Sequence, residues 1–171
     1  MEKTVESERL VFRKLKKEDF DTISVFLKAP DVMYAWGHGF SDEEVREWLD
    51  KNLKRYEDNG YAFFLAVNKQ TQDAVGAMGI IYNEIDGRWR WEIGYILDKR
   101  FWGQGYAREG AKAFLDHAFT KMGIDEVAFQ IRDSNIASQK VAESLGACRE
   151  GAYIRHYYGE DMPHYIYVVR K

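Results

Sequence analysis

Two glycines, Gly103 and Gly105, stand where an alternating segment gives way to a segment with helical spacing. Before them, apolar side chains recur at every second position from Trp89 to Leu97, which predicts a strand. After them, small and apolar residues recur at helical spacing as far as Met122. The unpaired N–H groups of a first helical turn attract anions, and glycine lets the backbone approach a ligand closely. This spacing therefore predicts a phosphate-binding turn.

Spacing also separates the known kinds of phosphate-binding loop. A Walker loop needs Lys-Ser or Lys-Thr after its last glycine, whereas Tyr106 follows Gly105. A dinucleotide fingerprint needs a third glycine at the position of Arg108. Neither loop fits, and a turn that only caps a structural helix is the remaining alternative to a ligand site.

The pattern Arg100-x-x-Gly103-x-Gly105-x-Ala107 closely resembles the acetyl-coenzyme A motif of the GNAT superfamily of N-acetyltransferases. Within it, the run from Trp102 to Ala107 is similar to the RimJ/RimL-type branch, the N-terminal acetyltransferases of ribosomal proteins and their relatives. The resemblance implies that acetyl-coenzyme A (acetyl-CoA) is the co-substrate. The implied cofactor-binding residues are Tyr95, Ile96, Leu97, Arg100, Trp102, Gly103, Gln104, Gly105, Tyr106, Ala107, Arg108, Asn135 and Lys140. Arg108 and Lys140 are read equally well as solvated helix charges.

The order of the predicted elements is similar to the whole GNAT fold. Strands are predicted near 9–13, 61–67, 75–82, 88–97, 126–132, 147–153 and 165–170, and helices near 17–27, 41–58, 106–122 and 135–145. The resemblance implies one domain over residues 1–171. Its fold class is α/β, with a mostly antiparallel mixed sheet of about six or seven strands and about four helices. It also implies that a central parallel pair, 88–97 and 126–132, splays apart to admit the pantetheine arm, with Tyr95, Ile96 and Leu97 offering backbone groups.

Composition excludes several classes of protein. The chain has 171 residues, of which 46% are hydrophobic, so it suits one compact domain. A net charge of −3 and the lack of a basic run argue against nucleic acid as a partner. No apolar run approaches the roughly 20 residues of a membrane span, and the N-terminus is charged rather than signal-like, so we expect a cytoplasmic protein. One cysteine and four histidines without ligand spacing argue against a metal site. Monomer and homodimer both remain open.

Acetyl transfer to an amine needs a neutral nucleophile, yet most free amines are protonated near neutral pH. A buried carboxylate removes this proton directly or through water. Glu92 is the candidate base because it lies on the strand face opposite Trp91 and Ile93, where GNAT relatives often carry a glutamate. The alternative is a solvated strand glutamate paired with Arg90 or Lys99.

Ser138 is the candidate that faces the leaving thiolate. Asn135-x-x-Ser138 resembles the helix start of the RimJ/RimL branch, where the asparagine binds the cofactor and the serine lies near the thioester sulfur. Many GNAT proteins carry an acidic tyrosine seven residues after that asparagine, and here Ala142 takes its place. A serine hydroxyl is a poor acid, so Ser138 would donate a hydrogen bond to sulfur. Its alternative role is a second hydroxyl that caps the helix.

Aromatic residues are predicted to wall the acceptor side, and core packing is the alternative for each of them. These residues are Trp36, His38, Phe40, Tyr157 and Tyr158. The resemblance implies a primary amine acceptor that attacks directly in a ternary complex. A protein N-terminus, a polyamine, an amino acid and an aminoglycoside-like antibiotic all remain open. From a different class of function, a CoA-binding sensor without turnover is the alternative.

Overall fold

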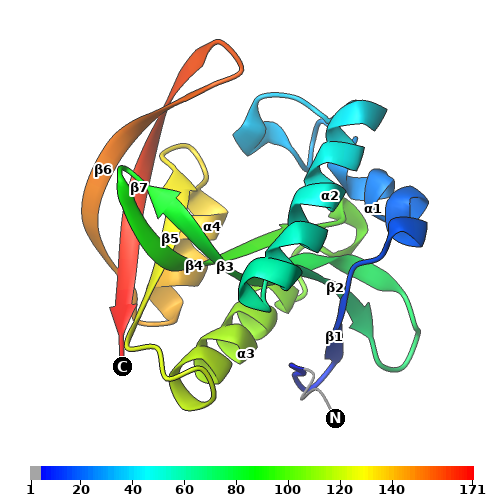
Figure 1. The fold of residues 1–171 in the computed structure, drawn as a ribbon, viewed down its shortest axis with the longest axis horizontal. Coiled ribbons are helices and arrows are strands. Elements are labelled where there is room, and N and C mark those ends of the chain that lie inside the picture. Colours follow the sequence, from blue (N-terminus) through cyan, green and yellow to red (C-terminus); the bar gives the residue numbers. More distant parts are fainter. Residues whose placement is uncertain (1–4) are drawn as a thin grey trace.

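The computed structural model describes residues 5–171, which build a seven-stranded sheet in the order β1-β2-β3-β4-β5-β7-β6 (Figure 1). The strands are β1 (Leu10–Lys14), β2 (Phe63–Asn68), β3 (Ala74–Ile85), β4 (Arg88–Leu97), β5 (Glu126–Arg132), β6 (Cys148–Tyr157) and β7 (Glu160–Arg170). Neighbouring strands are antiparallel except for the parallel pair of β4 and β5. The predicted mixed, mostly antiparallel sheet is confirmed.

The α-helices lie close to their predicted places: α1 (Phe20–Leu27), α2 (Asp42–Asn59), α3 (Tyr106–Thr120) and α4 (Ile136–Ser144). Short 3₁₀ turns occur at η1 (Lys17–Asp19), η2 (Tyr34–Trp36) and η3 (Lys99–Phe101). A capping box opens α2, since Glu44 N donates to Ser41 Oγ at 3.2 Å and Ser41 N donates to Glu44 Oε1 at 3.1 Å. No helix in the described part of the chain is long and apolar enough to cross a membrane.

Each face of the sheet carries its own hydrophobic core. On one face, Phe114 of α3 packs with Ile93 of β4 and their neighbours. On the other face, α1 and α2 cover a cluster that includes Ile81 of β3 and Ile96 of β4. Because successive side chains of a strand point to opposite faces, the even-numbered residues of β4 face α2 and the odd-numbered ones face α3 and α4. Glu92 therefore faces α2.

The parallel pair at the centre of the sheet separates almost at once. β4 and β5 are in register at Glu92 and Ala128, and no further pair joins them among the described residues. Beyond that point, the edge of β4 from Ile93 to Leu97 is open toward α4. The predicted splay at the centre of the sheet is present.

The end of the chain differs from its prediction. Arg155, His156 and Tyr157 were expected between two short strands, but they belong to β6, and the turn falls at Tyr158 and Gly159, both with positive φ. β6 is an edge strand with alternate side chains exposed, so its apolar pattern is weak. β7 tolerates its proline at 163, because its pairing with β5 begins one residue later.

Candidate active site

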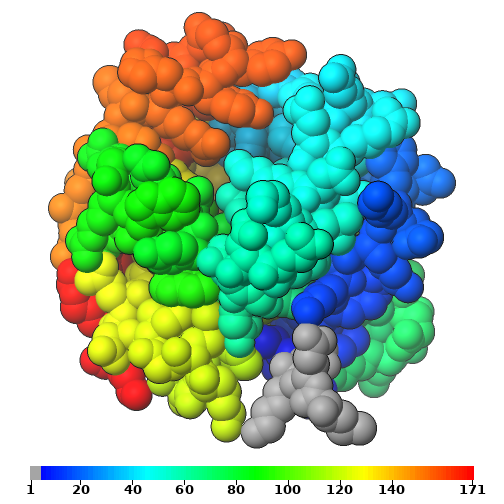
Figure 2. Space-filling model, in the orientation of Figure 1, coloured from blue at the N-terminus to red at the C-terminus, as the bar shows by residue number. Residues whose placement is uncertain are grey.

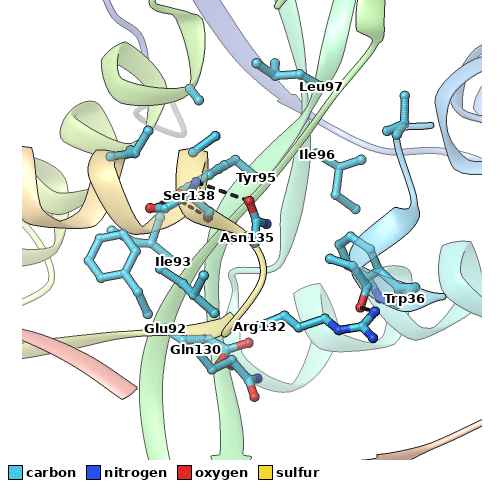
Figure 3. Close-up of a pocket in the computed structure, with 18 of the residues that line it drawn as sticks. Trp36, Glu92, Ile93, Tyr95, Ile96, Leu97, Gln130, Arg132, Asn135 and Ser138 are labelled. Atoms are coloured by element: carbon cyan, nitrogen blue, oxygen red, sulfur yellow. Dashed lines mark hydrogen bonds between the residues drawn. The ribbon is translucent and has the colours of Figure 1, made fainter. Parts of the chain in front are cut away.

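A cavity of about 690 Å³ lies where β4 and β5 part. Its walls include Trp48 of α2 and Glu92 from one face of the sheet, and Tyr95, Gly105 and Ser138 from the other. Glu92, Tyr95 and Ser138 are labelled in Figure 3. Side chains from both faces line one continuous space, so the cavity passes through the sheet at the splay. In Figure 2 the surface is hollowed between the orange β6–β7 hairpin, the cyan α2 and the green β3–β4 hairpin.

The turn before α3 forms one end of this cavity. Gly103 and Gly105 have φ of +73° and +82°, a backbone conformation that favours glycine. The first helical hydrogen bond runs from Glu109 N to Gly105 O, so the N–H groups before Glu109 have no carbonyl of α3 to bind. A Cβ on Gly103 would meet no atom within 4 Å, and one on Gly105 would meet Arg9 Nη2 at 3.6 Å. An open turn with free donors fits the pyrophosphate of CoA.

Three of the predicted cofactor-binding residues, Arg100, Gln104 and Lys140, lie outside the cavity lining, and their role in cofactor binding stays a prediction. The Arg100 guanidinium pairs with the Asp98 carboxylate, with Nη2 and Oδ2 2.8 Å apart. The same carboxylate accepts the backbone N–H of Arg100 at the start of η3, which keeps the two side chains together. Gln104 donates its side-chain amide to the Arg100 carbonyl at 3.2 Å, and Lys140 is exposed on α4. The Leu97 carbonyl already accepts the indole N–H of Trp102 at 3.0 Å. The other predicted cofactor-binding residues line the cavity.

A pair of hydroxyl groups faces the cavity where α4 begins. Ser138 Oγ donates to Tyr95 Oη at 2.8 Å, and Tyr95 Oη donates to the Ser138 carbonyl at 3.0 Å. Asn135 Oδ1 caps the helix by accepting Ser138 N–H at 3.2 Å, the contact dashed in Figure 3. Burial raises the pKa of Tyr95, so its phenol stays protonated. Sequence reasoning used only the backbone of Tyr95 and missed this hydroxyl, which the alternation along β4 could have placed beside α4.

The Glu92 carboxylate is buried, with 8% of the residue exposed. Gln130 Nε2 donates to Oε2 at 2.7 Å, and Asn83 Nδ2 lies 3.4 Å from Oε1. Tyr153 Oη donates to Gln130 Oε1, which turns the amide N–H₂ toward Glu92. Burial raises the pKa of Glu92, while these amide hydrogen bonds and the positive charges of nearby arginines oppose the rise. Glu92 is therefore a carboxylate that holds a proton more readily than an exposed one.

The two cations named as partners of Glu92 in the alternative reading, Arg90 and Lys99, pair with other carboxylates. Arg90 Nη2 lies 2.7 Å from Glu126 Oε1, and Lys99 Nζ lies 2.6 Å from Asp31 Oδ2. No ion pair to Glu92 occurs among the residues that the structure describes. The alternative reading of Glu92 as a solvated, paired strand glutamate does not match its burial.

The aromatic loop before α2, residues 31–40, has some side chains in the cavity wall and others in the hydrophobic core. Trp36 and, from β6, Tyr157 line the cavity, and Arg132 Nη1 ties the loop to β5 by donating to the carbonyls of Tyr34 at 3.0 Å and Ala35 at 3.3 Å. Figure 3 shows Arg132 reaching toward Trp36. The loop is therefore held over the Glu92 side of the cavity.

Three of the predicted acceptor-side aromatics do not line the cavity. Phe40 is 7% exposed and packs in the core beneath α1 and α2. His38 Nε2 lies 2.7 Å from Glu44 Oε2, and its ring stacks on Tyr158 with centroids 3.9 Å apart. The reason is local: Phe40 N donates to the Leu27 carbonyl at 2.8 Å, which turns this end of the loop inward.

Trp36→Ala and Phe40→Ala should separate the two roles of the loop. We expect Trp36→Ala to raise the acceptor KM about five- to ten-fold, as for the loss of one aromatic contact, with little change for acetyl-CoA. Phe40→Ala should lower the free energy of unfolding by about 3–5 kcal/mol. Steady-state kinetics and chemical denaturation measure both. A normal acceptor KM in Trp36→Ala together with a large loss of stability would make this part of the loop purely structural.

His164 and one face of α2 also line the cavity, and sequence reasoning singled out neither. His164 is buried, and its Nδ1 shares a hydrogen bond of 2.9 Å with the Met162 carbonyl, which leaves Nε2 as an acceptor. Burial lowers the pKa of His164, so the ring is neutral near pH 7. On α2, Trp48, Lys51 and Arg55 share one face at helical spacing and line the cavity. Their helical spacing is the one sequence signal that could have indicated that these three side chains lie together.

Comparison with known families agrees with this geometry. The family model described as the acetyltransferase (GNAT) domain matches residues 9–147. This chain belongs to the GNAT family of acetyl-CoA-dependent N-acetyltransferases. A Bacillus licheniformis protein named as the uncharacterized N-acetyltransferase p20 is 31% identical over 152 residues, which cover 86% of this chain and 84% of that protein.

Solved structures share the GNAT fold of this enzyme over nearly its full length. A GNAT-family acetyltransferase from Bacillus anthracis has a TM-score of 0.82 at 24% identity, with 98% of each chain covered. RimL, named as a ribosomal L7/L12 alpha-N-protein acetyltransferase in complex with CoA, has a TM-score of 0.76 at 21% identity, again with 98% of each chain covered. The predicted similarity to RimL-type proteins is confirmed at the level of the fold.

Proposed function

We propose that this GNAT enzyme acetylates a primary amine that enters from the α2 side, with Glu92 as its base, while CoA binds at the turn before α3. The observation that carries the proposal is the single cavity that joins buried Glu92 to Gly103 and Gly105 through the gap between β4 and β5. A co-substrate and an acceptor that approach from opposite faces of a sheet meet in such a gap. That arrangement supports direct transfer in a ternary complex.

Acetyl-CoA supplies an acyl thioester, whose thiolate leaves when the amine attacks. Glu92 accepts a proton from the incoming amine, directly or through one water. Its raised pKa makes the ionised form a better base than an exposed carboxylate. Gln130 holds the carboxylate in place through its hydrogen bond of 2.7 Å, so the base is positioned before the amine arrives.

The leaving sulfur needs a hydrogen-bond donor, and the Tyr95–Ser138 pair supplies it in this proposal. A phenol is intrinsically more acidic than a serine hydroxyl, so Tyr95 is the candidate proton donor although burial raises its pKa. Its O–H, which donates to the Ser138 carbonyl in the structure, would turn toward the sulfur. Ser138 Oγ, which donates to Tyr95 Oη at 2.8 Å, would support the negative charge left on the phenol. This arrangement would compensate for Ala142, which stands where many GNAT proteins carry their tyrosine acid.

The sensor alternative predicts CoA binding without turnover, and thiol release separates the two. We expect the protein, incubated with acetyl-CoA and a panel of amines, to release free CoA with at least one of them at a rate well above a control without amine. The panel contains amino acids, amino acid amides, short peptides, spermidine and an aminoglycoside. Intact CoA binding with no amine-dependent thiol release from any of them would favour the sensor.

A further inference from the structure

Besides Arg132, which donates to the loop carbonyls of Tyr34 and Ala35, three cations line the cavity on the Glu92 side of the sheet. Lys51 and Arg55 lie four residues apart on α2, so their side chains leave the same face of the helix. Arg155 reaches the cavity from β6. All three interact electrostatically with Glu92, yet none is close enough to form an ion pair with it. The cations thus surround the proposed base at a distance.

Within the described part of the chain, these cations have no hydrogen-bonding or ion-pairing partner. The guanidinium carbon of Arg155 lies 5.1 Å from the centroid of the Tyr157 ring. Desolvation at the cavity wall lowers the pKa of Arg55 and of Lys51, and the like charges of Arg55 and Arg155 lower that of Lys51 further. Lys51 is exposed and Arg55 and Arg155 are half-buried, so water reaches them, but their like charges repel one another and an anion between them would relieve this repulsion.

Other arginines of this chain do find carboxylates. Arg13 Nη2 lies 2.7 Å from Asp19 Oδ1, and Arg170 Nη1 lies 2.9 Å from Glu150 Oε2. In the cavity lining, Glu92 is the one carboxylate, and its hydrogen bonds come from neutral amides. Three unpaired cations therefore face a single buried acid, and the Glu92 side of the cavity carries a net positive charge.

The cofactor does not account for this charge. The turn that fits the CoA pyrophosphate belongs to α3, which packs on the face of the sheet opposite α2. Arg108, the cation at that end, donates to Ser144 Oγ at 3.1 Å. Lys51 and Arg55 extend from α2 on the acceptor side. The anion that would balance these cations is therefore expected to be part of the acceptor.

We propose that the acceptor carries a carboxylate besides its amine, and that Lys51, Arg55 and Arg155 bind this carboxylate while Glu92 faces the amine. The inference deepens the proposed function and rests on it. A guanidinium binds a carboxylate through paired hydrogen bonds, which also orient the molecule. The neighbouring walls are apolar, with Trp36, Trp48 and Phe63 among them. An α-amino acid with an apolar side chain matches this set, whereas a polyamine would bring further positive charge to the cations.

Matched acceptors test the inference with the enzyme unchanged. Leucine, methionine, phenylalanine and tryptophan are each compared with their primary amides and with spermidine. Losing charged hydrogen bonds should lower kcat/KM for an amide about 10- to 100-fold relative to its acid. Because an amide's amine is more often neutral at pH 7, a preference for the acid would go against intrinsic reactivity. Equal use of acid and amide, or a preference for spermidine, would overturn the inference and leave the proposed N-acetyltransferase activity standing.

Substitutions test whether the preference for acid over amide depends on the cavity arginines. Arg55→Met and Arg155→Met should each remove most of the preference for acid over amide, mainly by raising the KM of the acid. Lys54→Met is the matched control, because Lys54 lies on the same helix, is exposed and pairs with Asp58 at 3.1 Å. The acid-to-amide ratio should be unchanged in the control. The same loss of preference in Lys54→Met would show a general charge effect and contradict a defined carboxylate site.

A binding measurement keeps the inference separate from turnover. In the presence of CoA, calorimetry should show N-acetyl-leucine binding at least about ten-fold more tightly than N-acetyl-leucinamide, with the difference lost in Arg55→Met. This difference without acetyl transfer to any amine would support the carboxylate site and reject the proposed activity. Acetyl transfer to amines without any such difference in binding would reject the carboxylate site and support the proposed activity.

Discussion

Glu92→Gln should lower kcat by about 10²–10⁴, the factor that general-base catalysis typically supplies, with the KM of acetyl-CoA nearly unchanged. Glutamine keeps the size of the side chain and can still accept the hydrogen bond from Gln130 Nε2. Raising the pH should partly rescue the variant, because more of the amine is then neutral in solution. A kcat within a few-fold of wild type at pH 7 would show that the amine arrives neutral or loses its proton to water.

The same substitution should affect stability in a pH-dependent way. Burial raises the pKa of Glu92, so the folded protein holds the proton at pH values where the unfolded chain has released it. The contribution of Glu92 to stability is thus fully present below the unfolded pKa and is lost as pH rises through the raised folded pKa. We therefore expect Glu92→Gln to raise the melting temperature near neutral pH relative to wild type, by an amount that shrinks toward pH 4.

Glu84→Gln is the control for both effects. Glu84 lies on the same β3–β4 hairpin but is exposed, outside the cavity lining. It should leave kcat and the pH dependence of melting unchanged. A melting difference for Glu92→Gln that grows as the pH falls would contradict the raised pKa and with it the argument that Glu92 is a strengthened base.

Local sequence signals predicted those elements whose side-chain pattern is unambiguous. β5 was placed at its observed bounds because four of its seven residues are buried and apolar and the strand is bounded by polar turns. α2 followed from the capping box of Ser41 and Glu44 and from the glycine at 60 that ends it. The β6–β7 hairpin was predicted too short because an edge strand needs few apolar residues and so leaves a faint pattern.

The residues of the candidate site also differ in how well the sequence predicted them. Residues in a contiguous motif, such as Gly103 and Gly105, were found by spacing, because the backbone conformation they provide is local. Residues brought to the cavity by tertiary packing, among them Lys51, Gln130 and His164, were missed. On a mostly polar helix such as α2, a basic side chain toward a cavity looks the same in sequence as one toward water. The structure shows that Lys51 faces the cavity and that Arg155 of β6 lines the same space.

Gly105→Val should abolish measurable CoA binding while the protein remains folded. The positive φ of +82° at Gly105 is costly for a β-branched residue, by roughly 1–3 kcal/mol. A Cβ there would meet Arg9 Nη2 at 3.6 Å, an ordinary contact, so the protein itself leaves room for the side chain. The added methyl groups would instead crowd the turn that we expect to receive the pyrophosphate, and any shift of the turn would move the N–H groups that bind it.

Gly60→Val supplies the matched control for strain. Gly60 ends α2 with φ of +80°, and a Cβ there would meet no atom within 4 Å. The two variants should therefore lose similar stability, measured by thermal melting, while calorimetry finds CoA binding lost only in Gly105→Val. Because Gly60 is outside the cavity lining, its variant should bind CoA as the wild type does. Unchanged CoA affinity in a folded Gly105→Val would mean that the turn before α3 is only a helix cap, and the cofactor end of the site would have to be placed elsewhere.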